Sequence, residues 1–100
     1  MCGISGYNGT EKASKILLNS LKSLEYRGYD SVGMMTLSNN QLHTKKDIGK
    51  VDDVNNKLHF MEMDGNMGIA HSRWATTGEV SKINSHPHFD CNNKIAVVHN

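Results

Sequence analysis

One amphipathic helix near the N-terminus limits what the rest of this chain can fold into. Apolar residues recur at i, i+3, i+4, i+8 and i+11, on one stripe of a helix: Ala13, Ile16, Leu17, Leu21 and Leu24. The turn signal Asn8-Gly9 precedes this helix, Thr10 is the candidate N-cap, and Gly28 supplies the stop. A helix with one apolar stripe has to bury that stripe against a second layer of structure.

Short apolar and β-branched runs on both sides of this helix predict strands. We expect them at residues 2–7, 32–37, 41–48, 67–74 and 94–100, with a hairpin turn at 38–40. A second helix is predicted from the spacing of Val51, Val54 and Leu58, and a long loop from the polar residues 75–93. This order indicates an α+β fold of mostly antiparallel strands, with residues 1–100 in one domain. Five short strands and two helices leave one sheet face under-covered, so we expect these residues to be the N-terminal portion of a longer domain.

The composition argues against several classes of function. The formal net charge is +1, which gives no electrostatic reason to expect nucleic acid or an anionic membrane as a partner. The longest apolar runs are too short to span a bilayer, and the N-terminus lacks the features of a signal peptide. Only two cysteines are present, Cys2 and Cys91, and they form no Cys-x-x-Cys pair. We therefore expect no disulfide framework and a cytoplasmic location.

Cys2 directly follows the initiator methionine, and this position could make it a nucleophile. If Met1 is removed, a thiol and a free α-amino group belong to the same residue. The unperturbed pKa of an α-amino group is roughly 7.7–8.0 and that of a thiol is about 8.5, so the amine can accept the thiol's proton near neutral pH. Nucleophile and base then share one residue, and Gly3 lets backbone approach closely behind it. The alternative is an incidental buried thiol in a first strand, and this motif alone does not decide between them.

Polar side chains at two predicted strand ends could complete a site. Arg73 lies at the end of the predicted fourth strand, and Thr76 and Thr77 come directly after that strand. A guanidinium there could clamp a carboxylate through two parallel hydrogen bonds, with a hydroxyl completing the site. A surface arginine paired with an acidic neighbour is the ordinary alternative. Trp74 fits a core position or a lid over a pocket. Asn100 could donate its NH2 to an oxygen that becomes negative during acyl transfer, or it could simply end a strand.

The histidines offer a weaker hypothesis, a metal site. His86, His88 and Cys91 could ligate zinc, but the paired spacing and the fourth ligand of a closed structural site are missing. A rigid loop held by hydrogen bonds is favoured, and no metal is expected. His71 and His99 lie in apolar strands and are predicted to be core histidines. No Gly-rich phosphate loop is present, the six methionines suit core filling, and no cofactor is expected.

Several segments together resemble the class II glutamine amidotransferases. The opening residues 1–7 are similar to the start of all these enzymes. Residues 24–33, 68–76, 84–88 and 97–100 resemble one branch of them in order and approximate spacing, the glutamine–fructose-6-phosphate aminotransferases. Glu-Tyr-Arg-Gly-Tyr-Asp-Ser, Arg-Trp-Ala-Thr and His-Pro-His distinguish this branch from phosphoribosylpyrophosphate amidotransferase, asparagine synthetase and glutamate synthase.

The resemblance implies a fold and a reaction. The fold is that of the N-terminal-nucleophile hydrolases, an αββα sandwich of antiparallel sheets, of which this chain would hold an incomplete part. Cys2 would attack the side-chain amide of L-glutamine and release ammonia, leaving a thioester that water hydrolyses. Asn100 would donate to the oxyanion, while Arg73 and Thr76 would hold the substrate's α-carboxylate.

The resemblance also implies supporting roles around the nucleophile. Trp74 would close over bound glutamine, His86 would shape the pocket, and Arg27 would lie near Cys2. Two positions depart from the usual pattern of the family: Thr77 replaces a histidine and Val80 replaces a frequent proline. We therefore expect the lid to close differently.

In the complete enzyme, the resemblance implies a channel that delivers ammonia to sugar-isomerase domains not present in these residues. Those domains would convert fructose 6-phosphate into glucosamine 6-phosphate, the entry to UDP-N-acetylglucosamine, in a homo-oligomer. A backbone donor after Asn100 and a later acidic residue would complete the glutamine site. We therefore expect little glutaminase activity from the 100 residues alone, and the alternative is an inactive fragment or interaction module of the same fold.

Overall fold

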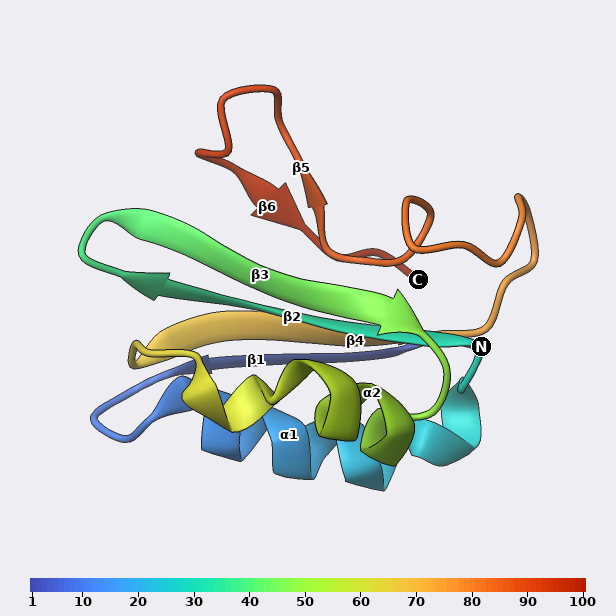
Figure 1. Ribbon diagram of the computed structural model, residues 1–100, viewed down its shortest axis with the longest axis horizontal. Helices are drawn as coiled ribbons and strands as arrows, with labels where there is room; N and C mark the ends of the chain where they lie inside the picture. Colours follow the sequence, from blue (N-terminus) through green and yellow to red (C-terminus); the bar gives the residue numbers. More distant parts are fainter.

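A four-stranded antiparallel sheet forms the centre of the computed structural model, which describes residues 1–100 (Figure 1). The strands follow the order β1-β4-β2-β3, and every neighbouring pair is antiparallel. Their bounds are β1 Gly3–Asn8, β2 Ser31–Ser38, β3 Gln41–Ile48 and β4 Met67–Arg73. All four strands predicted before residue 75 are therefore present, and the fourth ends one residue earlier than expected.

Two helices cover one face of this sheet (Figure 1). Helix α1 spans Ala13–Leu24 and helix α2 spans Val51–Leu58, as the apolar spacing predicts. Each is followed by a short 3-10 turn, η1 at Glu25–Arg27 and η2 at Phe60–Glu62. No helix is long and apolar enough to cross a membrane.

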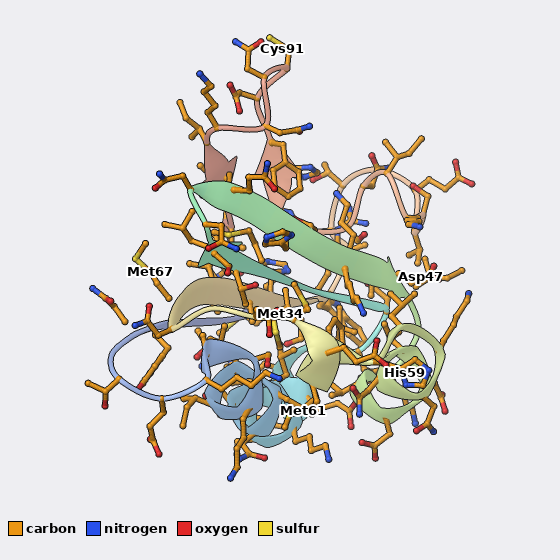
Figure 2. All side chains as sticks on the ribbon, turned by 60° about the vertical axis from the view of Figure 1, so that its left-hand side comes forward. Met34, Asp47, His59, Met61, Met67 and Cys91 are labelled. Carbon is orange, nitrogen blue, oxygen red and sulfur yellow. The ribbon has the colours of Figure 1, made fainter.

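The hydrophobic core lies between the sheet and the two helices, and Figure 2 shows Met34 there. Its members come from both helices, from β2 and β4, and from the chain after α2: Ala13, Leu17, Leu18, Leu21, Val32, Met34, Val51, Val54, Phe60, Met63 and Ala70. The buried stripe of α1 is rotated from the predicted one. Leu18 is buried, whereas Ile16 and Leu24 are only half-buried and line an open surface groove.

The predicted N-cap of α1 is wrong. The helix follows Lys12 rather than Thr10, and no side chain caps it. Its first amide, from Ala13, instead donates to the carbonyl of Gly65 at 2.9 Å. A loop from a distant part of the chain therefore satisfies a donor that the sequence assigned to a local cap.

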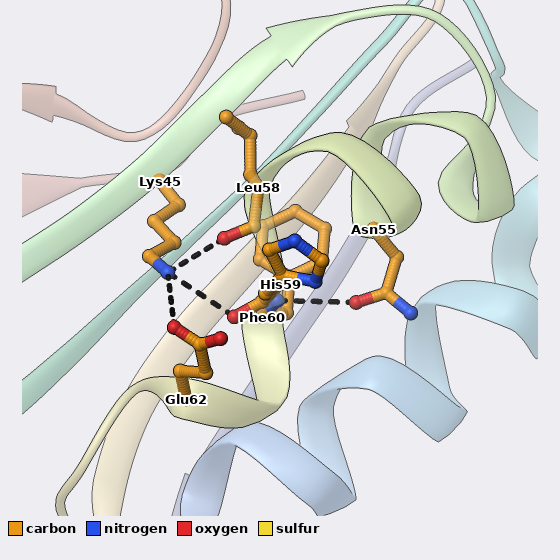
Figure 3. Close-up of polar contacts among 6 residues, drawn as sticks. All are labelled: Lys45, Asn55, Leu58, His59, Phe60 and Glu62. Carbon is orange, nitrogen blue, oxygen red and sulfur yellow. Dashed lines mark hydrogen bonds and ion pairs between the residues drawn. The ribbon is translucent and has the colours of Figure 1, made fainter.

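The C-terminal end of α2 is fixed by Lys45 of β3 (Figure 3). Its ammonium group donates to the carbonyl of Leu58 at 2.6 Å and to that of His59 at 3.1 Å. His59 takes the left-handed conformation with φ 58°, which turns the chain out of the helix. A cation at helix carbonyls is favourable because the last carbonyls have no intrahelical partner.

The C-terminal segment, residues 85–100, differs most from the prediction. A small hairpin, β5 His88–Phe89 with β6 Ala96–Val97, lies over the sheet face opposite the helices (Figure 1). The expected strand at 94–100 is thus only two residues long and does not join the main sheet. The carboxylate of Asp90 explains this, because it accepts from the amides of Lys94 and Ile95 at 2.7 and 2.8 Å and closes a tight turn.

The register of the main sheet brings the ends of three strands together at one end of the sheet. Gly3 lies opposite Ser72, and Ser31 lies opposite Arg73. The end of β4 therefore runs between the beginnings of β1 and β2. This arrangement places Cys2 beside the chain that leaves β4.

Candidate active site around Cys2

Cys2 lies in a small pocket formed by both ends of the chain. Its sulfur is 3.4 Å from the amide nitrogen of Trp74, which donates to it, and 3.7 Å from the carbonyl oxygen of the same residue. The pocket measures about 230 Å³, and its lining includes the thiol, the last turn after α1 and the end of the chain: Cys2, Gly3, Ile4, Leu24, Arg27 and Asn100. The thiol is free and half-buried.

Gly3, next to the nucleophile, leaves no room for a side chain, and the neighbours that exclude one are Ser72 and Leu24 rather than the thiol. A Cβ added there would lie 2.7 Å from the hydroxyl oxygen of Ser72 and 2.8 Å from the Cβ of Leu24. Both contacts are shorter than packed atoms allow, so a larger residue would push β1 away from β4 and from the end of α1.

Asn100 joins Cys2 through its side chain. Its carboxamide oxygen accepts from the backbone nitrogen of Cys2 at 3.1 Å. Because the oxygen is used as the acceptor, the NH2 group of Asn100 is free to donate to a third group. The structure thus brings these two candidate residues together across nearly the whole length of the chain.

Arg27 lines the same pocket as Cys2, and the resemblance implied that these two residues lie close together. One terminal nitrogen of its guanidinium is 3.4 Å from the sulfur of Met1. Met1 is 64% exposed, and with Tyr26, Arg27 and Trp74 it lines an adjoining pocket of about 390 Å³. Arg27 lines both this pocket and the one around the thiol.

The guanidinium of Arg73 is held by the loop that follows it. Arg73 is only 7% exposed and donates to the carbonyls of Thr77 at 2.7 Å and Glu79 at 3.2 Å. Asn84 donates to the same Glu79 carbonyl at 2.9 Å. Thr76 is exposed, and no hydrogen bond joins its hydroxyl to Arg73. The loop occupies the donors that sequence reasoning assigned to a substrate.

Trp74 lies at the surface and lines the pocket that it shares with Met1, Tyr26 and Arg27. It is 44% exposed, and its ring meets Tyr29 edge-on with 5.3 Å between centroids. The ammonium of Lys50 lies 5.5 Å from the centre of the Tyr29 ring on the same surface. The indole is therefore a surface element and not part of the core, which favours the lid interpretation over the core interpretation.

Asp30 supports the backbone against which the thiol lies, and sequence analysis did not single it out. One carboxylate oxygen accepts from the amide of Ala75 at 2.5 Å, and the Asp30 amide donates to the carbonyl of Arg73 at 3.0 Å. Asp30 therefore fixes both sides of Trp74. Residues 26–31 are rich in hydrogen-bonding groups, which indicated that this loop makes polar contacts. That pattern did not indicate that Asp30 bonds to the backbone on both sides of Trp74.

The imidazole of His86 lies against two others, stacked on that of His71 and tilted against that of His88. Its ring is 4.0 Å from that of His71, nearly parallel, and 4.3 Å from that of His88. Burial, followed by the nearby charges of other histidines, Arg73 and Lys46, lowers the pKa of His86 to about 4. Burial also lowers the pKa of His71 and of His88. These rings are therefore neutral near pH 7.

The two predicted core histidines differ. His71 is fully buried, and its Nε2 is 2.8 Å from the carbonyl oxygen of His99, as expected for a hydrogen-bonded core residue. His99 itself is exposed and lies beyond the two-residue strand β6, so the prediction that it is a core histidine is wrong. The zinc site considered for His86, His88 and Cys91 is not formed: Cys91 is exposed at the hairpin tip (Figure 2), and no group of three His, Cys, Asp or Glu side chains is placed to hold a metal ion.

Comparison with known proteins agrees with the motifs. The chain is 57% identical over 100 residues to a protein of Methanococcus maripaludis and 53% identical over 100 residues to one of Pyrococcus horikoshii, both named glutamine–fructose-6-phosphate aminotransferase [isomerizing]. Each alignment covers 100% of this chain but only 16% and 17% of the relative, in its N-terminal part. The chain matches no family model.

A solved structure confirms the fold class. Glutamine phosphoribosylpyrophosphate amidotransferase from B. subtilis superposes with a TM-score of 0.78 over 92% of this chain and 20% of that one, at 29% identity. These 100 residues therefore form part of an N-terminal-nucleophile α+β fold. The resemblance to class II amidotransferases is confirmed.

Proposed function

Since the chain matches the N-terminal part of glutamine–fructose-6-phosphate aminotransferases, we propose that its Cys2 releases ammonia from L-glutamine once Met1 is removed. The observation that supports this most directly is the shared pocket of Cys2 and Asn100. The thiol, the nitrogen that becomes the α-amine, and a free carboxamide NH2 meet there. Met1 is exposed, so an aminopeptidase can reach it.

The first step is attack by the thiol. The neutral α-amine of Cys2 takes the thiol proton, and the sulfur forms a bond to the amide carbon of glutamine. The carbonyl oxygen becomes negative, and the NH2 of Asn100 donates to it. While Met1 is attached, the Cys2 nitrogen is an amide without basicity, so this step requires processing.

The second step releases ammonia. The carbon–nitrogen bond breaks, the protonated amine of Cys2 returns the proton to the leaving nitrogen, and a glutamyl thioester remains on the sulfur. Water then attacks the thioester, giving glutamate and restoring the thiol. The amide of Trp74, 3.4 Å from the sulfur, would stabilise the thiolate before it attacks the amide carbon and again when water displaces it from the thioester.

The substrate's α-carboxylate is proposed to bind Arg73 and Thr76. Arg73 already satisfies its donors with two loop carbonyls, so the carboxylate would replace them as the loop rearranges. Such an exchange favours the substrate, because hydrogen bonds from arginine to a carboxylate are stronger than those to a neutral carbonyl. Trp74 would cover the bound glutamine, and His86 would shape its pocket.

The reaction of the whole protein lies beyond this chain, which spans 16–17% of the relatives' length. We propose that the ammonia passes to fructose 6-phosphate in isomerase domains and yields glucosamine 6-phosphate, in a cytoplasmic homo-oligomer. A dry passage between the two sites is chemically required, because ammonia that reaches water is protonated and no longer nucleophilic.

The decisive experiment uses the full-length protein. We expect ammonia release from glutamine, and we expect a glutamine-like electrophile to modify Cys2 and not Cys91, as read by peptide mass spectrometry. Excess glutamine should block the modification, and Cys91→Ser should leave both results unchanged. An inactive wild-type protein whose Cys2 resists labelling would instead support a non-catalytic interaction module of the same fold. An active enzyme that retains Met1 would exclude the N-terminal amine as the base.

A further inference from the structure

Three residues form a row across the sheet face opposite the helices. In the register of the sheet, Gly33 of β2 lies opposite Lys46 of β3 on one side and His71 of β4 on the other. Residues directly opposite one another project to the same face. Val32 and Met34, on either side of Gly33, belong to the core under the helices. The row therefore faces the C-terminal segment that crosses above it (Figure 1).

The C-terminal segment rests on this row at three points. A Cβ at Gly33 would overlap the carbonyl oxygen of His86, so the segment lies directly on the backbone of β2. The ammonium of Lys46 donates to the carbonyls of Ser85 at 2.8 Å and Pro87 at 2.9 Å. The third contact joins His71 to the carbonyl of His99 at 2.8 Å.

The contact made by His71 reaches the nucleophile in two steps. The carbonyl of His99 belongs to the peptide bond that carries Asn100, and the Asn100 side chain accepts from Cys2. A carbonyl can only accept, so Nε2 of His71 must carry the hydrogen. The Nδ1 atom is buried without a partner, and the His86 ring stacks on the imidazole 4.0 Å away. The ring is thus fixed in one plane and one tautomer.

We infer that His71 is a positioning residue for Asn100: its Nε2–H holds the carbonyl of His99 and thereby keeps the Asn100 carboxamide against Cys2. His71 touches neither the thiol nor the expected substrate. Its effect on rate rests on the proposed function, because only an acyl-transfer reaction uses the carboxamide as an oxyanion donor. Its effect on the C-terminal segment does not.

The first test compares two substitutions of His71 in the full-length enzyme. His71→Gln can place an NH2 near the position of Nε2, whereas His71→Met has similar reach and no donor. We expect kcat for ammonia release to fall about 10- to 100-fold in His71→Met, below the 10²–10³ typical of losing an oxyanion donor outright. KM should change much less, and His71→Gln should recover most of kcat.

A double substitution separates positioning from general destabilisation. If His71 acts through Asn100, then His71→Met added to Asn100→Ala should lower kcat no further than Asn100→Ala alone. Lys45→Met is the control, because it loosens α2 on the opposite face and should leave kcat unchanged. Multiplicative losses in the double variant, or a His71→Gln enzyme as slow as His71→Met, would overturn the inference.

Hydrogen exchange tests the same tie without activity. In the full-length protein, exchange of the amides in residues 88–99 should be faster in His71→Met than in wild type and restored in His71→Gln. Unchanged exchange in His71→Met would overturn the inference even if glutamine is hydrolysed. If the wild type releases no ammonia but the exchange pattern holds, the proposed function fails while the tie between His71 and the segment stands.

Discussion

The guanidinium of Arg73 donates to the carbonyl of Thr77 across 2.7 Å, so the loop after β4 closes on the side chain proposed to hold glutamine. A second contact, to the carbonyl of Glu79, uses another nitrogen of the same group. Two nitrogens of Arg73 are therefore already bonded to loop carbonyls. Substrate binding has to exchange one set of acceptors for another.

Arg73→Lys should weaken substrate binding more than it slows the chemistry. Lysine keeps the charge but cannot form two parallel hydrogen bonds with a carboxylate. Hydrogen bonds to charged groups are worth about 1.5–3 kcal/mol, so KM for glutamine should rise roughly 10- to 100-fold. Steady-state kinetics of the full-length enzyme will show this. A large loss of kcat at unchanged KM would mean that Arg73 acts in the reaction rather than in binding.

Gly33→Ala should displace the C-terminal segment, because the new Cβ would overlap the carbonyl oxygen of His86. Gly6→Ala is the matched control in the same sheet, since its Cβ would have no neighbour closer than 3.9 Å. We expect Gly33→Ala to lower kcat/KM at least tenfold, as misplacement of a distant support can cost about 10²-fold. Gly6→Ala should stay within about twofold of wild type. Equal activities of the two variants would show that the close approach at Gly33 has no bearing on the site.

Lys45→Met should loosen the end of α2. The ammonium donates to the carbonyls of Leu58 and His59, and its loss leaves both without this partner. We expect local stability, measured by hydrogen exchange of the α2 amides, to fall by about 1–2 kcal/mol. Lys22→Met removes only an exposed ion pair with Asp52, 3.5 Å long, and should cost less than about 0.5 kcal/mol. Similar losses in the two variants would show that the helix end does not depend on Lys45.

Acid should lower the stability of the fold in two stages. The pKa of His86 is about 4 in the fold against an ordinary 6.5, so the unfolded chain binds a proton there before the folded chain does. Its contribution to stability is complete above pH 6.5, is lost as pH falls toward 4, and changes no further below that. Hydrogen bonds from Lys57 and from the amide of Ile48 lower the pKa of Asp47, so its contribution is lost only as pH falls below about 4.

Exchange of the amides in β2 and β4 as a function of pH measures this effect. His86→Phe should flatten the decline between pH 6.5 and 4, while His43→Phe, at an exposed position on β3, should leave it as in wild type. An unaltered decline in His86→Phe would place the acid sensitivity elsewhere.

The sequence was sufficient to predict which helices and strands lie between residues 3 and 73, because local signals mark most of their ends. Asn8-Gly9 ends β1, Gly28 ends the helical chain after α1, and residues 38–40 turn β2 into β3. Local turn chemistry and apolar spacing are properties of neighbouring residues, so they can be read without a structure.

Long-range contacts could not be read in this way. The amide of Ala13 is satisfied by Gly65 rather than by Thr10, and Asp90 shortens the final strand by drawing two amides into a turn. The row at Gly33 depends on which strands are neighbours, and the strand order follows from packing and not from any single segment. Motifs indicated which residues could carry chemistry, whereas Asp30 and His71 act through partners far along the chain.

The strand order also determines when β1 can join the sheet during synthesis of the protein. β1 pairs only with β4, so it has no neighbour in the sheet until Met67–Arg73 has been synthesised. Until then the first residues are an unpaired tail, and the cysteine they carry has no pocket around it. An aminopeptidase can therefore remove Met1 and expose the amine of Cys2 before the residues that form the site around the thiol have been synthesised.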